Sequence, residues 1–168
     1  MKTSLFLVIF ITLCITNVAH AHSKADLLWV ARACWIEAEF RANDCIATTW
    51  IAKKRAPILK VSWPQAMKMY SAIMKKNPRA AKARTFPWGN VSGMTVSFNE
   101  KWHALLELVK QIANNEHADP CPDAKHWGGT IDPQKSFMYK AQCKTSQITL
   151  SKLDIEPLAN TFYGVKKK

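Results

Sequence analysis

The chain has 168 residues, of which 48% are hydrophobic, and 24 Lys and Arg against 12 Asp and Glu give it a net charge of +12. This length provides one compact core and excludes two full-sized domains, so we expect a single domain. The positive charge predicts attraction to polyanions such as nucleic acid, membrane surfaces or cell-wall polymers, and it does not choose among them.

The N-terminal residues have the pattern of an export signal. Lys2 precedes an apolar run over residues 5–15, and residues 19–21 (AHA) have the small-x-small form of a signal-peptidase site. The run is shorter than the about 20 apolar residues that a membrane-spanning helix needs. We therefore expect cleavage after Ala21 and a periplasmic or secreted domain over residues 22–168.

Four cysteines remain in that exported domain. An even number in an oxidising compartment favours two disulfides. Sequence order suggests that Cys34 pairs with Cys45 and ties one helix to the next, and that Cys121 pairs with Cys143 and closes a loop-rich segment. Other pairings stay open from the sequence alone.

The first half of the domain predicts a helical hairpin. Residues 25–40 carry apolar side chains on nearly every side of a helical wheel, which is typical of a buried helix. Residues 41–44 indicate a turn, in which Asn43 or Asp44 caps a second helix over about residues 45–55.

Two further helices are expected. Ser62 followed by Pro64 predicts the start of a helix that runs to about residue 75. Residues 76–97 contain prolines and glycines without a period, which predicts a long loop. Ser97 has capping-box spacing to Glu100, ahead of a helix with a periodic apolar face. Beyond residue 115 we expect short strands or irregular structure.

The segment ACWIEAEF, residues 33–40, places two carboxylates in an apolar helix. On a helical wheel Glu37 lies beside small and apolar residues, whereas Glu39 lies on another side, so the two do not form a pair. Apolar surroundings disfavour the charged form of an acid and allow it to donate a proton near neutral pH, which makes Glu37 the candidate acid. The alternative is that both glutamates form structural ion pairs with Arg32 and Arg41.

The run LLWVARACWIEAEF, a turn and then CIATTWIAKKRA resemble the start of the cell-wall hydrolase family typified by the spore-cortex-lytic enzymes. The later segments DAKHWGG and NTFYG are similar to the aromatic segment and the closing Asn-x-aromatic-aromatic segment of that family. The resemblance implies a mainly α, lysozyme-like domain of the lytic-transglycosylase type, with a loop-rich or short-strand C-terminal part. It also implies that Glu37, which precedes Ala38, is the essential acid.

One departure from the family concerns a second acid. The family usually has another acidic residue in an Arg-Gly-Glu context, whereas this chain has Glu39-Phe40-Arg41. Glu39, Asp44 or neither takes that role.

The resemblance implies cleavage of the glycan strand of peptidoglycan by a single acid. Glu37 would protonate the glycosidic oxygen between N-acetylmuramic acid and N-acetylglucosamine, and groups of the substrate would quench the positive charge on the sugar. In the transglycosylase version the ionised residue then removes a proton from the muramic acid hydroxyl, which closes an anhydro ring. We expect no cofactor, peptidoglycan as the partner and a monomeric enzyme.

Sugars commonly bind to aromatic faces with polar groups around them, and simple packing explains such aromatic residues equally well. The loop HWGG at residues 126–129 is the most site-like, because adjacent glycines let a ligand approach the backbone closely. Trp63 and Trp102 are expected in the core. The candidate sugar-binding residues are Trp88, His126, Trp127, Phe162 and Tyr163.

Two alternatives belong to other classes. His117, Cys121, His126 and the neighbouring aspartates are all zinc ligands by type, which would make the protein a zinc-dependent wall amidase or peptidase. Their spacing matches no Cys-x-x-Cys or His-Glu-x-x-His pattern, and Cys121 is expected in a disulfide. The second alternative is a non-enzymatic basic protein that binds cell-wall polymer. Because no RNA-binding consensus is present, we expect no specific nucleic-acid partner.

Overall fold

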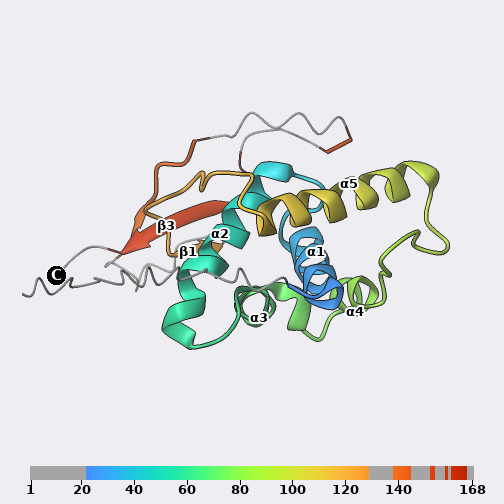
Figure 1. Cartoon of the computed structure of the whole chain (residues 1–168), viewed down its shortest axis with the longest axis horizontal. Helices are drawn as coiled ribbons and strands as arrows, with labels where there is room; N and C mark the ends of the chain where they lie inside the picture. Colours follow the sequence, from blue (N-terminus) through green and yellow to red (C-terminus); the bar gives the residue numbers. More distant parts are fainter. Residues whose placement is uncertain (1–21, 129–137, 145–151, 154–157, 159, 166–168) are drawn as a thin grey trace, which may run out of the picture.

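The structure is a computed structural model, and it describes residues 22–128, 138–144, 152–153, 158 and 160–165. The expected signal segment with its cleavage site after Ala21, Gly129 of the HWGG loop and the three C-terminal lysines lie outside the described residues. The described part is mainly helical with a small sheet, which confirms a mainly α fold (Figure 1). Its elements are α1 (Lys24–Ala38), α2 (Ala42–Leu59), α3 (Trp63–Tyr70), η1 (Ala72–Met74, a 3-10 turn), α4 (Pro78–Arg84), α5 (Val96–Ala113), β1 (His126–Gly128), β2 (Met138–Lys140) and β3 (Thr161–Val165).

Helix α1 is the central element, in contact with α2, α3, α4 and α5. It begins at a capping box, in which Ser23 accepts from the N–H of Asp26 at 3.1 Å and the Asp26 carboxylate accepts from the N–H of Ser23. It ends at Ala38, two residues before the predicted end. There Glu39 has φ 55° and ψ −110°, and the C=O of Ala38 accepts from the N–H of Arg41 at 3.0 Å. The chain therefore turns directly after α1 into α2.

Helix α2 begins three residues earlier and ends four residues later than predicted. The predicted cap at Asn43 or Asp44 is wrong, because both residues lie inside the first turn and are fully buried, and Arg41 takes the N-cap position. The carboxylate of Asp44 has a partner elsewhere in the fold, the N–H of Asn160. At the other end the helix continues past Pro57 and stops at Lys60, which has the left-handed conformation.

The prediction for residues 62–97 is right at its start and wrong further on. Ser62 caps α3 as expected, but α3 ends at Tyr70 rather than near residue 75, because Ser71 is extended and caps η1 instead. The predicted long loop contains α4. Its start signals are the Asn77 side chain, which accepts from the N–H of Ala80 at 2.8 Å, and Pro78 in the first turn.

Helix α5 has the predicted apolar face, with Trp102, Leu105 and Val109 all fully buried. Its predicted capping box is wrong, because Thr95 is the N-cap and accepts from the N–H of Phe98 at 3.1 Å. The carboxylate of Glu100, which the prediction used for the box, pairs instead with Lys152 at 3.0 Å.

The C-terminal part contributes a three-stranded antiparallel sheet with the order β1-β3-β2. In Figure 1 the sheet lies at one end of the molecule beside α2, while α5 lies on one side of α1 and α3 and α4 lie on the other. Both predicted disulfides are present, Cys34–Cys45 and Cys121–Cys143. Within the described residues no helix has the length and apolar character needed to cross a membrane.

Candidate functional site

Glu37 lies in the last turn of α1 and is partly buried. One oxygen, Oε1, accepts from the backbone N–H of Ala72 at the start of η1. The other, Oε2, accepts from the indole Nε1–H of Trp127 in β1 at 3.0 Å. A carboxylate has about four lone-pair sites, so two N–H donors fix its orientation and leave sites for a reacting proton.

Trp127, which donates to this carboxylate, also lines a hollow. The hollow has a volume of about 160 Å³ and is lined by Arg55, Tyr70, His126 and Trp127. The rings of Tyr70 and Trp127 meet edge to face with centroids 6.5 Å apart, and the Arg55 guanidinium lies 3.7 Å from the centre of the Tyr70 ring. Trp127 therefore lines the hollow and also donates a hydrogen bond to Glu37.

The Arg55 side chain also sets the orientation of His126. Nη1 of Arg55 lies 3.0 Å from Nδ1 of His126. Because a guanidinium only donates, Nδ1 accepts in this contact, which leaves the ring proton on Nε2. The contact therefore orients the imidazole at the hollow.

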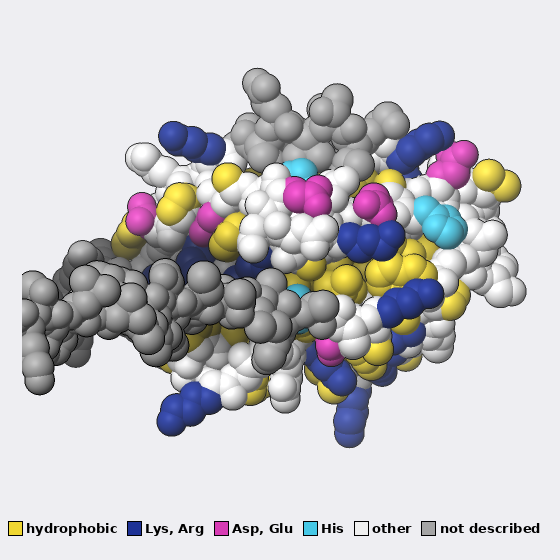
Figure 2. All heavy atoms as spheres, viewed as in Figure 1, with side chains coloured by type: hydrophobic (Ala, Val, Ile, Leu, Met, Phe, Trp, Pro, Cys, Tyr) yellow, Lys and Arg dark blue, Asp and Glu magenta, His cyan; other side chains and the backbone are white. Residues whose placement is uncertain are grey.

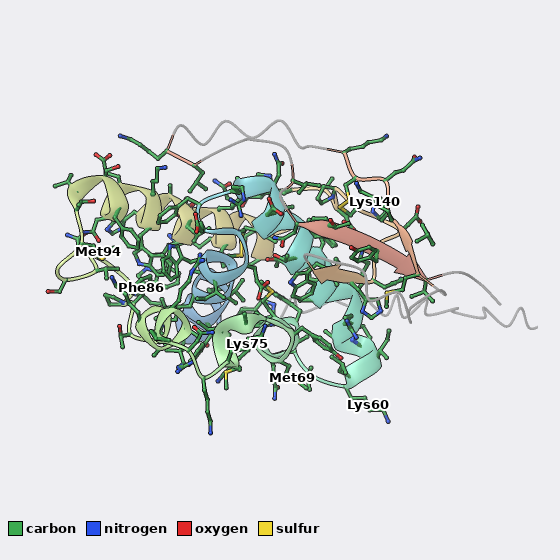
Figure 3. All side chains as sticks on the ribbon, turned by 180° about the vertical axis from the view of Figure 1, so that it is seen from behind. Lys60, Met69, Lys75, Phe86, Met94 and Lys140 are labelled. Carbon is green, nitrogen blue, oxygen red and sulfur yellow. A yellow bond between two sulfur atoms is a disulfide. The ribbon has the colours of Figure 1, made fainter. Side chains whose placement is uncertain are left out.

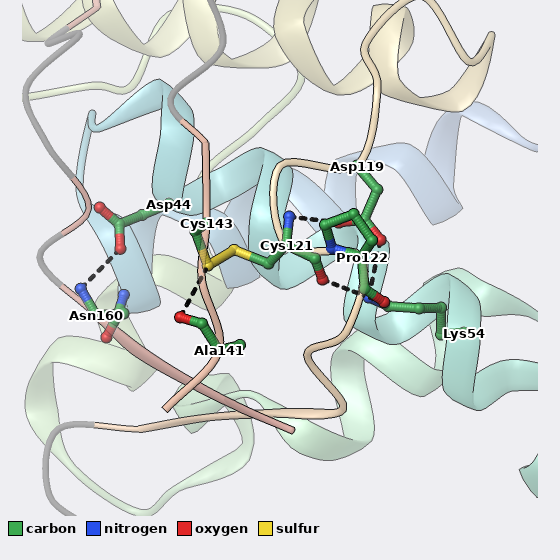
Figure 4. Close-up of a disulfide and its surroundings, with 8 residues drawn as sticks. All are labelled: Asp44, Lys54, Asp119, Cys121, Pro122, Ala141, Cys143 and Asn160. Atoms are coloured by element: carbon green, nitrogen blue, oxygen red, sulfur yellow. Dashed lines mark hydrogen bonds and ion pairs between the residues drawn. A yellow bond between two sulfur atoms is a disulfide. The ribbon is translucent and has the colours of Figure 1, made fainter. Parts of the chain in front are cut away.

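Asn160 ties the C-terminal strand to the end of α1. Its side-chain Nδ2–H donates to the C=O of Glu37 at 2.9 Å. Its backbone N–H donates to Oδ1 of Asp44 at 2.8 Å (Figure 4). Asp44 is fully buried and its other oxygen pairs with Arg41 at 3.5 Å. Asp44, a candidate second acid from the sequence, thus has a structural place between α2 and β3.

The second candidate, Glu39, points away from Glu37 to α4. Its side chain is 56% exposed and pairs with Arg79 at 3.0 Å. The predicted ion pairs with Arg32 and Arg41 are wrong. Arg32 donates two hydrogen bonds to the C=O of Phe86, and burial lowers the pKa of its guanidinium from the ordinary value.

Three of the predicted sugar-binding aromatic residues do not join the hollow. Phe162 and Tyr163 in β3 are only 2% and 5% exposed, so their rings belong to the core and offer no face to a ligand. Trp88 lies at the other end of α1, where the Nζ of Lys24 is 5.4 Å from its ring. Lys24 and Glu37 are thirteen residues apart, about 20 Å along a helix. Trp102 is buried as expected.

The candidate ligands of the zinc-enzyme hypothesis do not come together in a metal site. Cys121 is bonded to Cys143, and Oδ2 of Asp119 pairs with Lys54 at 2.8 Å (Figure 4). His117 contacts Gln111 at 2.9 Å, and burial lowers its pKa although the charge of Glu116 opposes that shift. In the part of the chain that the structure describes, no three His, Cys, Asp or Glu residues come close enough to hold a metal ion.

Sequence reasoning missed four groups at the site. Tyr70 and Arg55 stand in no motif that marks them as site residues. The backbone N–H of Ala72 has no side-chain signal at all. Asn160 stands in the NTFYG segment, and a polar residue directly before a strand of apolar residues is a usable signal for such a tie.

The assembled groups are one carboxylate, one imidazole, one guanidinium and two aromatic rings. Such a set can hold a sugar by stacking and polar contacts, and its carboxylate can transfer a single proton. No carboxylate is among the residues that line the hollow, and Glu37 is connected to it through the hydrogen bond with Trp127. Comparison with known proteins adds no assignment: no family model, no curated protein and no solved structure matches the chain.

Proposed function

We propose that the protein is an exported enzyme that cleaves the glycan strand of peptidoglycan, with Glu37 as general acid and base. The observation that carries the proposal is the carboxylate of Glu37, held by N–H donors from Ala72 and from Trp127, the latter of which also lines an aromatic hollow. Fixing a reacting group in one orientation removes much of the entropic cost of the reaction. The mainly helical domain supports a lysozyme-like architecture as part of the same proposal.

The proposed reaction needs only one acid. Protonated Glu37 donates its proton to the glycosidic oxygen, the bond from that oxygen to the muramic acid carbon breaks, and positive charge develops on the sugar. Either water or the muramic acid hydroxyl then attacks that carbon. The ionised Glu37 takes up the proton that the attacking oxygen releases, so the enzyme returns to its starting state.

The hollow provides the binding half of the mechanism. The rings of Tyr70 and Trp127 supply apolar faces for a pyranose ring, and the cation of Arg55 supplies hydrogen-bond donors for its oxygens. Because the indole N–H of Trp127 also holds Glu37, a sugar on that ring is placed next to the proton donor.

The test is digestion of purified peptidoglycan followed by mass analysis of the fragments. General acid–base catalysis contributes about 10²- to 10⁴-fold, so Glu37→Gln should lose activity on that scale. Glu39→Gln is the matched control, because Glu39 lies two residues away, is exposed and pairs with Arg79. It should keep activity within a few-fold of the wild type.

The fragments also separate the outcomes. Anhydro-muramyl ends identify a transglycosylase and new reducing ends a hydrolase. Release of stem peptides alone contradicts the proposal in favour of an amidase or peptidase. Binding to the wall without any digestion, or full activity of Glu37→Gln, contradicts it in favour of a non-enzymatic binding protein or another catalytic residue.

A second variant tests the positioning of the acid. Trp127→Phe keeps an aromatic ring and removes the N–H that donates to Glu37. Loss of one hydrogen bond to a charged group predicts a fall in kcat of about tenfold or more with little change in KM. Trp88→Phe, at the opposite end of α1, should leave both parameters unchanged.

A further inference from the structure

The positive charge of the chain is concentrated in one segment. Residues 45–99 contain 10 of the 24 Lys and Arg and none of the 12 Asp and Glu. Residues 22–44 and 100–168 together contain 13 Lys and Arg against 12 Asp and Glu. Outside residues 1–21, therefore, nearly all of the net charge comes from residues 45–99.

The basic segment folds into one side of the molecule. Most of α2, all of α3, η1 and α4, and the turns between them come from residues 45–84, and α3 contacts both α2 and η1 while α4 contacts η1. In Figure 2 Lys and Arg lie at both the upper and the lower margin, whereas most of the visible Asp and Glu lie in the upper half, so the lower margin has cations with few visible acids. In Figure 3, Lys60, Met69 and Lys75 lie along the lower side. We call this side the basic face, defined by Lys60, Lys68, Lys75, Lys76 and Lys82.

Little of this charge is neutralised locally. No lysine of the basic face forms an ion pair with another residue that the structure describes. The nearby acidic side chains are already engaged: Asp26 accepts from the Ser23 hydroxyl at 2.7 Å, and Glu39 pairs with Arg79. The face therefore presents unbalanced positive charge to solvent.

Large apolar side chains are exposed among these lysines. Ile58 is 76% exposed, Met69 56% and Met74 52%, although most large apolar residues of the domain are buried. Met69 and Met74 also border a hollow of about 460 Å³ between α1 and α3, together with Trp29 and Lys68. The Nζ of Lys68 lies 4.0 Å from the centre of the Trp29 ring. The basic face thus combines cations with apolar groups that can leave water.

This combination distinguishes between anionic partners. A soluble polyanion such as DNA or an anionic wall polymer needs only the lysines, and it gives exposed Ile and Met no place to be buried. A lipid surface uses both, because lysines contact phosphate headgroups while apolar side chains enter the boundary between headgroups and acyl chains. We propose that the basic face binds the surface of a membrane that contains anionic lipid, with Ile58, Met69 and Met74 inserted among the headgroups.

The binding would place the candidate site close to that surface. Tyr70 lines the same hollow as Trp127. Its chain neighbour Met69 is one of the exposed apolar residues of the basic face. The membrane proposal does not depend on the proposed function, because it is built on residues other than Glu37 and those that fix it.

The experiment is flotation of the exported protein with vesicles of phosphatidylcholine alone or of phosphatidylcholine with phosphatidylglycerol. All variants share the same N-terminal residues, so differences in vesicle binding between them are due to the substituted residues of the basic face or of the control. The wild type should float only with the anionic vesicles, and added salt should weaken the binding. Lys60→Glu with Lys75→Glu should weaken it at least tenfold, as should Met69→Ser with Met74→Ser.

Two comparisons make the result decisive. Lys140→Glu with Lys144→Glu is the matched control, because it makes the same charge change at exposed lysines in and after β2, and it should alter vesicle binding less than twofold. Binding to a DNA duplex should fall with the basic-face lysine variant but not with the methionine variant. If the methionine variant floats like the wild type, or if the control weakens binding as much as the basic-face lysine variant, the proposal is overturned. Thermal unfolding checks that each variant is folded, and activity on soluble glycan fragments should be unchanged.

Discussion

The Glu39→Gly variant should be more stable than Glu39→Ala, although glycine is usually the less stable of these two residues. Glu39 has φ 55° and ψ −110° in a turn closed by the hydrogen bond from the N–H of Arg41 to the C=O of Ala38. These angles are those of the first central position of a type II′ turn, which glycine adopts at no steric cost and other residues disfavour. A non-glycine residue in such a conformation costs of order 1–3 kcal/mol.

The expected magnitude follows from three terms. Glycine removes the steric cost at position 39 and adds about 0.5–1 kcal/mol of backbone entropy in the unfolded chain. Both glycine and alanine remove the pair with Arg79, whose side chains are 56% and 47% exposed, so that loss is worth at most about 1 kcal/mol. We therefore expect Glu39→Gly to be more stable than Glu39→Ala by about 1 kcal/mol.

Equilibrium unfolding in urea with the disulfides intact measures this difference. The midpoint should rise from the alanine to the glycine variant without a change in slope, and the melting temperature should rise by about 2–4 °C. At an ordinary position the order is reversed, with glycine the less stable residue. If Glu39→Gly is no more stable than Glu39→Ala, the strained turn after α1 is not a feature of the folded protein.

Two other predictions concern stability. Desolvation lowers the pKa of Lys53 from 10.5 to about 8, so between about pH 8 and 10.5 the unfolded chain binds more protons than the folded one, and the free energy of unfolding should rise with pH. The rise should be smaller in Lys53→Met. Urea unfolding of this variant and the wild type at pH 7.5, 9 and about 10 measures it. An equal rise of the unfolding free energy with pH in both proteins would contradict the lowered pKa of Lys53. Replacing Cys34 and Cys45 together by alanine should lower the free energy of unfolding by about 3 kcal/mol, from the entropy of closing a loop with a separation of 11 residues. Urea unfolding of the wild type and the double variant, both with Cys121–Cys143 intact, measures this difference, and equal midpoints would show that the Cys34–Cys45 bond does not constrain the unfolded chain.

The parts of the fold that the sequence predicts well are those set by local pattern. The periodic apolar face identifies α5, the all-round apolar wheel identifies α1, and Ser62 with Pro64 identifies the start of α3. Neighbouring cysteines in sequence order also give the correct disulfides. Each of these signals comes from residues close together in the chain.

The parts that the sequence misses depend on contacts between distant residues. The start of α2 could not be placed because the partner of Asp44 is the N–H of Asn160, more than a hundred residues later. Helix α4 has only seven residues and too little apolar pattern to be recognised, and its Pro78 also fits a loop. At the site, Glu37 was identified from its apolar helix, but its donor at Ala72 is a backbone group that any residue other than proline could supply.

The two hydrogen bonds of Asn160 also affect the order in which parts of the fold can form during synthesis. Its contacts with Glu37 and Asp44 span 123 and 116 residues, so the ends of α1 and α2 lack these hydrogen bonds until residue 160 has been synthesised. Closing loops of this size is slow relative to local helix formation. A nascent chain can therefore contain α1 and α2 well before the Asn160 hydrogen bonds fix the end of α1 at position 37.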